Sequence, residues 1–317
     1  MCGITGFIDF GFNSSQTIVE EMGAKIQHRG PDSCGSFFET ITDYQIGFAH
    51  QRLSIIDLSK DGHQPMSLSD GSLKVVFNGE IYNYKEVRKS LQNSGAEFNT
   101  QSDTEVVLQA WKKWGKECLV HFNGMFAFAV FDSLNQKVTL VRDRAGVKPL
   151  YVYQKDDIIL FGSELKSLLV HPQFEKEINI GATGLFMQYG YYPEPHTVFK
   201  NCTKLKAAHT LEIDLKNRHS SINEYWSLTE KFHSNENRNK SENEILEELE
   251  TLMKSSFEYR MVSDVPVGVF LSGGYDSTAV TALLQKSTNQ TINTFTIGFE
   301  EDAYNEAHYA KKVAEYL

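Results

Sequence analysis

The stretch Met125-Phe126-Ala127-Phe128-Ala129-Val130-Phe131 is apolar throughout and lies between Gly124 and Asp132. It is short for a helix, rich in aromatic residues and bounded by turn-forming residues, so it predicts a buried strand. A second run of this kind follows at residues 137–141. Strands of this type decide the fold of the first two-thirds of the chain.

Five further segments have the same composition and bounding turn residues, namely residues 45–50, 73–77, 150–153, 158–161 and 211–215. Helical spacing is rarer. Ile18, Met22 and Ile26 recur at this spacing, a second such pattern ends before Gly95, and residues 102–105 have the form of a capping box. Because strands outnumber helices, we expect stacked sheets covered by a few helices.

The pattern changes after about residue 215. Residues 216–240 are interpreted as a linker, because 231–240 are polar and asparagine-rich without an apolar period. A capping box at 241–244 begins a helix, followed by a strand (265–271), a glycine turn, a helix from about Ser277, a strand (294–299) and a last helix. Strands that alternate with helices predict a parallel α/β sheet. We therefore expect two domains, 2–215 and 241–317. The second is expected to be part of a longer protein, because a sheet of only two parallel strands has open edges and incompletely covered faces and would be marginally stable alone.

Composition excludes several classes of protein. The 317 residues carry a net charge of -10 and a pI of about 5.5, which disfavours nucleic acid and anionic membranes as partners. No segment offers the roughly 18 uncharged apolar residues of a spanning helix, and the N-terminus lacks a signal-peptide pattern. The four cysteines have no CxxC or metal-ligand spacing. We expect a reduced, cytoplasmic enzyme.

Cys2 is the first candidate for chemistry. A small residue after Met1 permits removal of the initiator, which leaves Cys2 with a free α-amine beside its thiol. With a pKa of about 7.7–8.0, that amine is partly neutral at physiological pH and can act as the base for the thiol. Gly3 would let the backbone approach a substrate closely. A lone cysteine is more often a small buried apolar residue, so the neighbouring motifs decide between these interpretations.

Five motifs follow one another along the first two-thirds of the chain: residues 1–7 (MCGITGF), 28–32 (HRGPD), 50–57 (HQRLSIID), 77–83 (FNGEIYN) and 102–105 (SDTE). Together they resemble the class II glutamine amidotransferase domain in its asparagine synthetase form. The resemblance implies an α+β domain, a four-layer αββα sandwich of the N-terminal-nucleophile type, with Cys2 as the nucleophile. Residues 142–151 resemble another family signature, which we interpret, like 28–32, as mainly architectural.

The resemblance also implies a glutamine site. Arg52 would hold the α-carboxylate, Asp103 the α-ammonium, and Asn78 and the N–H of Gly79 the oxyanion. Ordinary roles stay open: an exposed strand-end arginine, a first-turn helix charge for Asp103 and an Asn-Gly hairpin turn. Further groups that would line the glutamine pocket are those of Leu53, Ser54, Ile55, Ile56 and Glu80.

Residues 272–277, Ser-Gly-Gly-Tyr-Asp-Ser, join the strand at 265–271 to a helix. A glycine-rich turn at a helix N-terminus presents backbone N–H groups to an anion, and no Walker lysine follows. The loop resembles the pyrophosphate-binding loop of ATP pyrophosphatases, which include the synthetase domain of asparagine synthetases; a plain β-turn-α junction is the alternative. The resemblance implies that Asp276 helps to hold Mg²⁺. It also implies ATP contacts from Leu271, Ser272, Gly273, Gly274, Asp276, Ser277 and Ile297.

The whole pattern implies a glutamine-dependent asparagine synthetase. Cys2 would release ammonia from glutamine, an apolar passage would carry it to the second domain, and there it would amidate an aspartate adenylated by ATP. Tyr275 stands where asparagine synthetases more often carry leucine, so another acceptor, such as a sugar uronate or a β-lactam precursor, stays open. So do a chain that acts only as a glutaminase and a non-catalytic module that binds glutamine or nucleotide. The acceptor pocket is expected beyond Leu317, and the oligomeric state, for which a homodimer is one option, is not fixed by the sequence.

Overall fold

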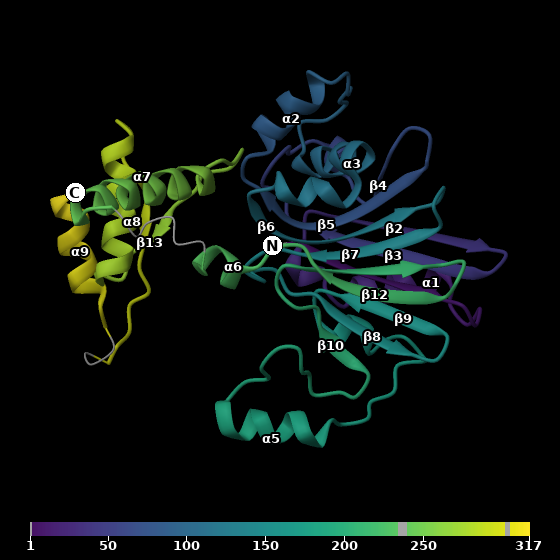
Figure 1. Cartoon of the computed structure of the whole chain (residues 1–317). Helices are drawn as coiled ribbons and strands as arrows, with labels where there is room; N and C mark the ends of the chain where they lie inside the picture. The colour runs from purple at the N-terminus through teal and green to yellow at the C-terminus, as the bar shows by residue number, and fades with distance from the viewer. Residues whose placement is uncertain (1, 234–239, 302–304) are drawn as a thin grey trace. The chain divides into compact units, whose positions relative to one another are not determined.

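The computed structural model describes residues 2–233, 240–301 and 305–317. The chain divides into two compact units, Met1–Thr229 and Glu230–Leu317 (Figure 1). Residues 234–239 of the predicted linker and Met1, whose removal is predicted, lie outside the described residues.

Two six-stranded antiparallel sheets form the first unit, in the orders β10-β8-β9-β1-β3-β2 and β12-β11-β7-β6-β5-β4. The strands of the first sheet are β1 (Gly3–Asp9), β2 (Ser33–Ile41), β3 (Tyr44–Arg52), β8 (Tyr151–Lys155), β9 (Ile158–Gly162) and β10 (Cys202–Lys204). Those of the second are β4 (Met66–Ser67), β5 (Leu73–Ile81), β6 (Gly124–Asp132), β7 (Lys137–Arg142), β11 (His209–Asp214) and β12 (His219–Glu224).

The two sheets pack face to face through an apolar core. Alternate residues of a strand point to the same face, so Ile4 and Ile8 of β1 join Ala127 and Ala129 of β6 in one buried cluster. Burying each large apolar side chain contributes about 1.5–3 kcal/mol. This core holds β1, which directly follows Cys2, against the second sheet.

Helices cover the outer faces. On the first sheet, α1 (Gln16–Ala24) and α4 (Leu165–Leu168) bury Val19 and Leu168 beside Phe7 of β1. On the second sheet, α2 (Tyr84–Gln92) and α3 (Asp103–Trp114) cover the strands (Figure 1), and Trp111 of α3 meets Phe128 of β6 edge to face. The remaining helical segments are η1 (Gln27–Arg29), η2 (Lys60–Gly62), η3 (Gly115–Val120), α5 (Ile180–Tyr189) and α6 (Leu228–His233).

The seven strand segments predicted from the sequence occur, as β3, β5, β6, β7, β8, β9 and β11. The sequence did not indicate β1, because Gly3 and Gly6 interrupt its pattern. Gly6 is required there, since a Cβ atom would overlap the Phe161 ring. Residues 219–224, within the predicted linker, form β12, which pairs with β11. This edge strand has mostly polar side chains, so its apolar signal is weak.

The capping box predicted at residues 102–105 forms only in part. Ser102 Oγ accepts the N–H of Thr104 at 3.1 Å, and α3 begins where predicted. Glu105 does not complete the box, because its carboxylate accepts the N–H groups of Asn99 (2.9 Å) and Thr100 (2.7 Å). The glutamate therefore ties down the loop before α3.

The second unit contains α7 (Glu242–Arg260), β13 (Val269–Phe270), α8 (Tyr275–Ser287), β14 (Thr294–Phe295) and α9 (Ala307–Tyr316). β13 and β14 are parallel, as predicted, although both are shorter than expected. The capping box of α7 forms in full between Ser241 and Glu244. No helix in the described parts of the two units is both long and apolar enough to cross a membrane.

Candidate active site

A pocket of about 220 Å³ in the first unit gathers side chains from distant segments of the chain. Of the predicted glutamine-site residues, Ser54 does not line it: its N–H bonds to Asp32 Oδ2 at 2.7 Å, beside a neighbouring depression. The others do line the pocket, namely Cys2, Arg52, Leu53, Ile55, Ile56, Asn78, Gly79, Glu80 and Asp103.

Cys2 directly precedes β1 and lines the pocket. The N–H of Leu53 donates to Cys2 Sγ at 3.4 Å, and Arg29 Nε donates to the Cys2 carbonyl at 2.9 Å. Burial raises the pKa of the thiol above its ordinary value, against the opposing effect of the hydrogen bond with Leu53. The thiol therefore needs a local base to ionise at neutral pH.

Asn78 and Gly79 lie within β5, which pairs with β6 along its whole length. The hairpin-turn alternative for this dipeptide is therefore wrong. Asn78 is fully buried, and its side-chain Nδ2 and Oδ1 have no hydrogen-bond partner among the described residues. An unpaired buried polar group costs about 1–3 kcal/mol, so a ligand in the pocket would gain by pairing with this amide.

The outer edge of β5 presents the N–H of Gly79 to the same pocket. Successive residues of an antiparallel strand direct their backbone groups alternately to one neighbour and the other. On this edge the N–H of Phe77 bonds to Gln64 Oε1 at 2.6 Å, and the N–H of Ile81 bonds to Asp103 Oδ2 at 3.0 Å. Gly79 lies between them and faces the pocket, where no strand continues the sheet. Its N–H is thus placed to meet a ligand beside the Asn78 amide.

Arg52 at the end of β3 is buried, so the alternative of an exposed strand-end arginine is wrong. Carbonyls of the following loop hold its guanidinium: Ser59 accepts from Nη1 at 2.7 Å, while Ile56 (3.4 Å) and Asp57 accept from Nη2. A Cβ atom at Gly62 would overlap the guanidinium. The loop thus fixes a cation at the pocket wall.

The pocket carries charges of both signs. Asp103 is both a first-turn residue of α3 and a pocket residue, and burial raises the pKa of its carboxyl to about 7. Burial also raises the pKa of Glu80 and lowers that of Lys148, although the Glu80 carboxylate opposes the shift of the lysine. Two cations, Arg52 and Lys148, and two carboxyl groups therefore face one small space. Such a set suits a zwitterion.

Several lining residues were not predicted: Gln64, Phe77, Ser102, Thr104, Met125, Val147 and Lys148. Lys148 belongs to the signature at 142–151, which was interpreted as mainly architectural. Asp143 does play that part, since its carboxylate accepts the N–H groups of Val147 and Lys148. The interpretation is incomplete, however, because the same turn brings the Lys148 side chain to the pocket. The position of Lys148, a basic residue within a recognised family signature, could have indicated from the sequence that it belongs to the site.

In the second unit, the predicted nucleotide loop joins β13 to α8. Gly273 has φ +85°, and a Cβ atom there would overlap Tyr309 at the start of α9. Ser272 Oγ lies 3.1 Å from Ser277 Oγ and accepts the N–H of Gly274 at 3.3 Å. Loop and helix start are open to solvent, including Asp276.

The two strand ends lie side by side, because the N–H of Leu271 bonds to the carbonyl of Phe295 at 2.9 Å. Ile297 follows β14 and is exposed, whereas Leu271 is buried. No group of three or more His, Cys, Asp or Glu residues in the described ranges could hold a metal ion by itself. Asp276 fits a Mg²⁺ that takes its remaining ligands from phosphate and water.

Residues 1–226 match the glutamine amidotransferase domain family. The chain belongs to this family. Residues 248–317 match the asparagine synthase family, so the predicted resemblance is confirmed in both parts. The N-terminal-nucleophile type of amidotransferase fold, with antiparallel sheets, is confirmed for the first unit. The roles predicted for individual pocket and loop residues stay predictions.

Several relatives of this family member are named as asparagine synthetases, and one as an amidase. The family member is 38% identical to putative asparagine synthetase (glutamine-hydrolyzing) 2 of Methanocaldococcus jannaschii, over 100% of this chain and 63% of that protein. Identity to asparagine synthetase (glutamine-hydrolyzing) 3 of Bacillus subtilis is 34%, over 97% of this chain and 50% of the relative. Amidase chry2 of Gibberella zeae is 32% identical, with 100% and 50% coverage. The amidotransferase chain thus spans about half to two-thirds of these relatives.

A solved structure supports the fold of the family member. Glutamine phosphoribosylpyrophosphate amidotransferase of B. subtilis superposes with a TM-score of 0.51 at 19% identity, covering 71% of this chain and 49% of the other. Similarity at this level concerns the fold alone.

Proposed function

We propose that this chain is the glutaminase part, together with the beginning of the ATP-dependent part, of a glutamine-dependent asparagine synthetase. One observation is the main support for glutamine hydrolysis by the first unit. Asn78, whose buried side-chain amide has no partner among the described residues, lines the same pocket as Cys2. An amide without a partner beside a nucleophile is what an oxyanion site requires before the charge develops.

Glutamine would be held by its two charged ends. Arg52 would bind the α-carboxylate with the N–H groups that the loop carbonyls leave free, and Asp103 would accept the α-ammonium. Glu80 and Lys148 add one charge of each sign at the wall. The side-chain amide would then lie between Cys2 and the β5 edge.

The chemistry would proceed in two steps. After removal of Met1, the α-amine of Cys2 accepts the thiol proton and the thiolate attacks the amide carbon. The resulting oxyanion accepts hydrogen bonds from Asn78 Nδ2 and the Gly79 N–H, and ammonia leaves with the proton that the amine returns, so a thioester remains. Water, deprotonated by the same amine, cleaves the thioester to glutamate and restores the thiol.

The loop at 272–277 would bind the phosphates of ATP through backbone N–H groups and the hydroxyls of Ser272 and Ser277, with Leu271 and Ile297 near the adenosine. Asp276 would hold Mg²⁺, which neutralises phosphate charge when bound. A carboxylate, most simply the β-carboxylate of aspartate, would attack the α-phosphate of ATP and release pyrophosphate, and ammonia would then displace AMP from the acyl-adenylate to give asparagine. Another acceptor carboxylate is the second candidate, because Tyr275 stands where asparagine synthetases more often carry leucine.

The test is glutamate release from glutamine with and without ATP, with ¹⁵N-amide label followed into ammonia. Wild-type chain is expected to hydrolyse glutamine, and Cys2→Ala to lose at least about 10³-fold in kcat, because no nucleophile remains. Cys34→Ala, an exposed thiol outside the pocket, is the matched control and should be unaffected. Binding of glutamine without turnover, or retention of Met1 in the intact mass, would favour a non-catalytic module.

A further inference from the structure

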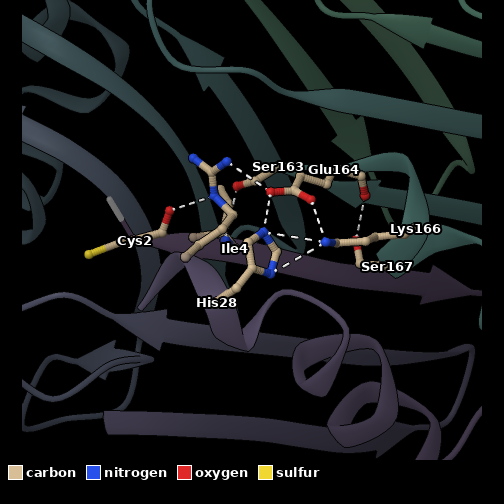
Figure 2. Close-up of polar contacts among 8 residues, drawn as sticks. Cys2, Ile4, His28, Ser163, Glu164, Lys166 and Ser167 are labelled. Carbon is tan, nitrogen blue, oxygen red and sulfur yellow. Dashed lines mark hydrogen bonds and ion pairs between the residues drawn. The ribbon is translucent and has the colours of Figure 1, made fainter. Parts of the chain in front are cut away.

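An ionic cluster lies behind the nucleophile, outside the pocket. Figure 2 shows the Glu164 carboxylate with His28 and Lys166 around it. Glu164 Oε1 lies 2.9 Å from His28 Nε2 and 3.0 Å from Arg29 Nη1, and Oε2 lies 3.1 Å from Lys166 Nζ. Residues 28–29 and 164–166 are far apart in sequence, so this contact is purely tertiary.

Arg29 connects the cluster to Cys2. Its Nε donates to the Cys2 carbonyl at 2.9 Å while its Nη1 donates to Glu164. A guanidinium is planar and rigid, so the position of Glu164 fixes the direction in which Arg29 reaches the nucleophile.

Ser163, the residue before Glu164, is hydrogen-bonded to the backbone of Ile4 in β1. Ser163 donates its N–H to the Ile4 carbonyl at 2.8 Å and accepts the Ile4 N–H on its Oγ at 3.0 Å. The turn after β9 therefore binds the start of the chain at two places. Ser163 is bonded directly to Ile4, and Glu164 is connected to Cys2 through Arg29.

An N-terminal nucleophile has a special need for such contacts. Once Met1 is removed, Cys2 has covalent support on one side only, and fixing a backbone residue costs about 1–2 kcal/mol of conformational entropy. Attack requires the sulfur to stay about 3–3.5 Å from the reacting carbon. Hydrogen bonds to the Cys2 main chain supply this constraint.

We propose that Glu164 is a positioning residue, which acts through Arg29 to fix the main chain of the Cys2 nucleophile; this inference rests on the proposed glutaminase function. Glu164 does not touch the substrate, because it is not part of the pocket wall and the Cys2 sulfur points away from it (Figure 2). Burial alone would raise the pKa of its carboxyl, but hydrogen bonds from Arg29, Lys166 and His28 outweigh this effect and lower the pKa to about 2. The carboxylate is thus charged throughout the working pH range.

The first test compares Glu164→Gln with Lys166→Gln in the full chain. Glu164→Gln keeps the shape but loses the charge that orients Arg29, so kcat for glutamine hydrolysis is expected to fall by about 10–100-fold. KM should stay within about twofold, because Arg52 and Asp103 bind glutamine separately. Lys166→Gln removes another partner of the same carboxylate without touching Cys2, and kcat should stay within about twofold of wild type. A loss confined to KM, or equal losses in both variants, would overturn the proposal.

A double-mutant cycle adds a readout that a general structural role would not move. If Glu164 acts through Arg29, then Glu164→Gln should cause no further loss of kcat in an Arg29→Ala background; multiplicative losses would contradict it. Should Glu164→Gln fail to fold, Arg29→Lys takes its place, because an ammonium cannot reach both Cys2 and Glu164 in the same geometry.

Hydrogen–deuterium exchange separates this proposal from the proposed function. The peptide that begins at Cys2 should exchange faster in Glu164→Gln than in wild type or Lys166→Gln. A wild-type chain that does not hydrolyse glutamine would refute the proposed function, while the exchange rates of the variants would still test whether Glu164 positions Cys2. If Glu164→Gln has the hydrogen-exchange rate and the kcat of wild type, the positioning role of Glu164 is refuted and the proposed function is not.

Discussion

Single residues in the pocket place groups of opposite charge where the two ends of an amino acid would lie. Arg52 and Lys148 supply the positive side and Glu80 and Asp103 the negative side. Burial raises the pKa of the Glu80 and Asp103 carboxyl groups and lowers that of the Lys148 ammonium. Substrate recognition should therefore depend on pH near neutrality.

Asp103 gives the first prediction. Because burial raises the pKa of its carboxyl to about 7, the group is neutral below that pH and cannot pair with an ammonium. Below pH 7, kcat/KM for glutamine should fall about tenfold per pH unit through protonation of Asp103, in addition to the fall of about tenfold per unit caused by protonation of the α-amine. In Asp103→Asn it should be at least about 30-fold lower, since a charged hydrogen bond is lost, and only the α-amine inflection near 7.7–8.0 should remain. An inflection near 7 that survives in Asp103→Asn would assign it to another group.

The raised pKa of Asp103 also makes the stability of the protein depend on pH. The folded-state pKa lies above the ordinary value of 3.8, so the contribution of this carboxyl is full below about pH 4 and is lost as pH rises through about 7. The free energy of unfolding of wild type should therefore fall across this window relative to that of Asp103→Asn.

Gly62 gives the second prediction. A methyl group there would overlap the Arg52 guanidinium, so Gly62→Ala should displace this cation from the pocket wall. KM for glutamine should rise about 10-fold or more, equivalent to about 1.4 kcal/mol of lost binding, with a smaller change in kcat. Gly184→Ala is the control, because among the described residues nothing beyond its own stretch of helix lies within 4 Å of a methyl group at that position. Equal KM values in the two variants would refute the argument.

At the scale of elements, side chains take the place of a missing strand along the edge of β5. β4 pairs with β5 only through Met66 and Ser67. Beyond that pairing, Gln64 accepts the Phe77 N–H, and His50 Nε2 donates to the Phe77 carbonyl at 3.1 Å. These two bonds fix the backbone of Phe77 on both sides, directly before Asn78, and leave the edge at Gly79 open.

His50 gives the third prediction. Burial lowers the pKa of its imidazole to about 3, so it stays neutral and serves as a donor. His50→Phe should reduce stability by about 1–3 kcal/mol, since the Phe77 carbonyl loses its partner, and should lower kcat by about 10-fold or more as the oxyanion site shifts. His171→Phe is the matched control: His171 is also buried and hydrogen-bonded, to Ser14, but does not line the pocket. It should lose stability while kcat is retained; loss of kcat in both variants would show a general effect.

At the scale of the whole molecule, the proposed glutamine pocket and the predicted nucleotide loop belong to separate units. All residues that line the pocket come from the first unit, and the loop lies in the second. Damage to one unit should therefore leave the chemistry of the other intact.

Gly273 gives the fourth prediction. Its φ of +85° and the adjacent backbone of α9 exclude a side chain, so Gly273→Ala should loosen the loop and α9. Faster hydrogen exchange in α8 and α9 and weaker ATP binding are expected, whereas kcat for glutamine hydrolysis should stay within about twofold of wild type. Gly298→Ala, where a methyl group has only ordinary contacts, is the control. A parallel loss of glutaminase activity would show that the units do not act separately.

The sequence predicted the strands that are continuous apolar runs, such as β6, because burial on both faces leaves a local signature. It did not predict β1 or β12, whose glycines and polar residues are placed by their neighbours rather than by their own propensity. Of the site, it predicted the residues that lie in recognisable motifs. Gln64, which belongs to none of these motifs, appears only when the chain folds back on β5.

The sequence by itself determined the family, the stacked sheets of the first part, the parallel sheet of the second and most of the groups that could bind glutamine, because residue type and order carry that information. Tertiary structure alone decided that Asn78 is buried without a partner, that Arg52 is held by its own loop and that Glu164 reaches Cys2 through Arg29. Arg29 and Glu164, which are hydrogen-bonded to each other, are 135 positions apart in the chain. The pairing of β1 with β9 and the packing of the two sheets bring such segments together, and both depend on the whole core at once.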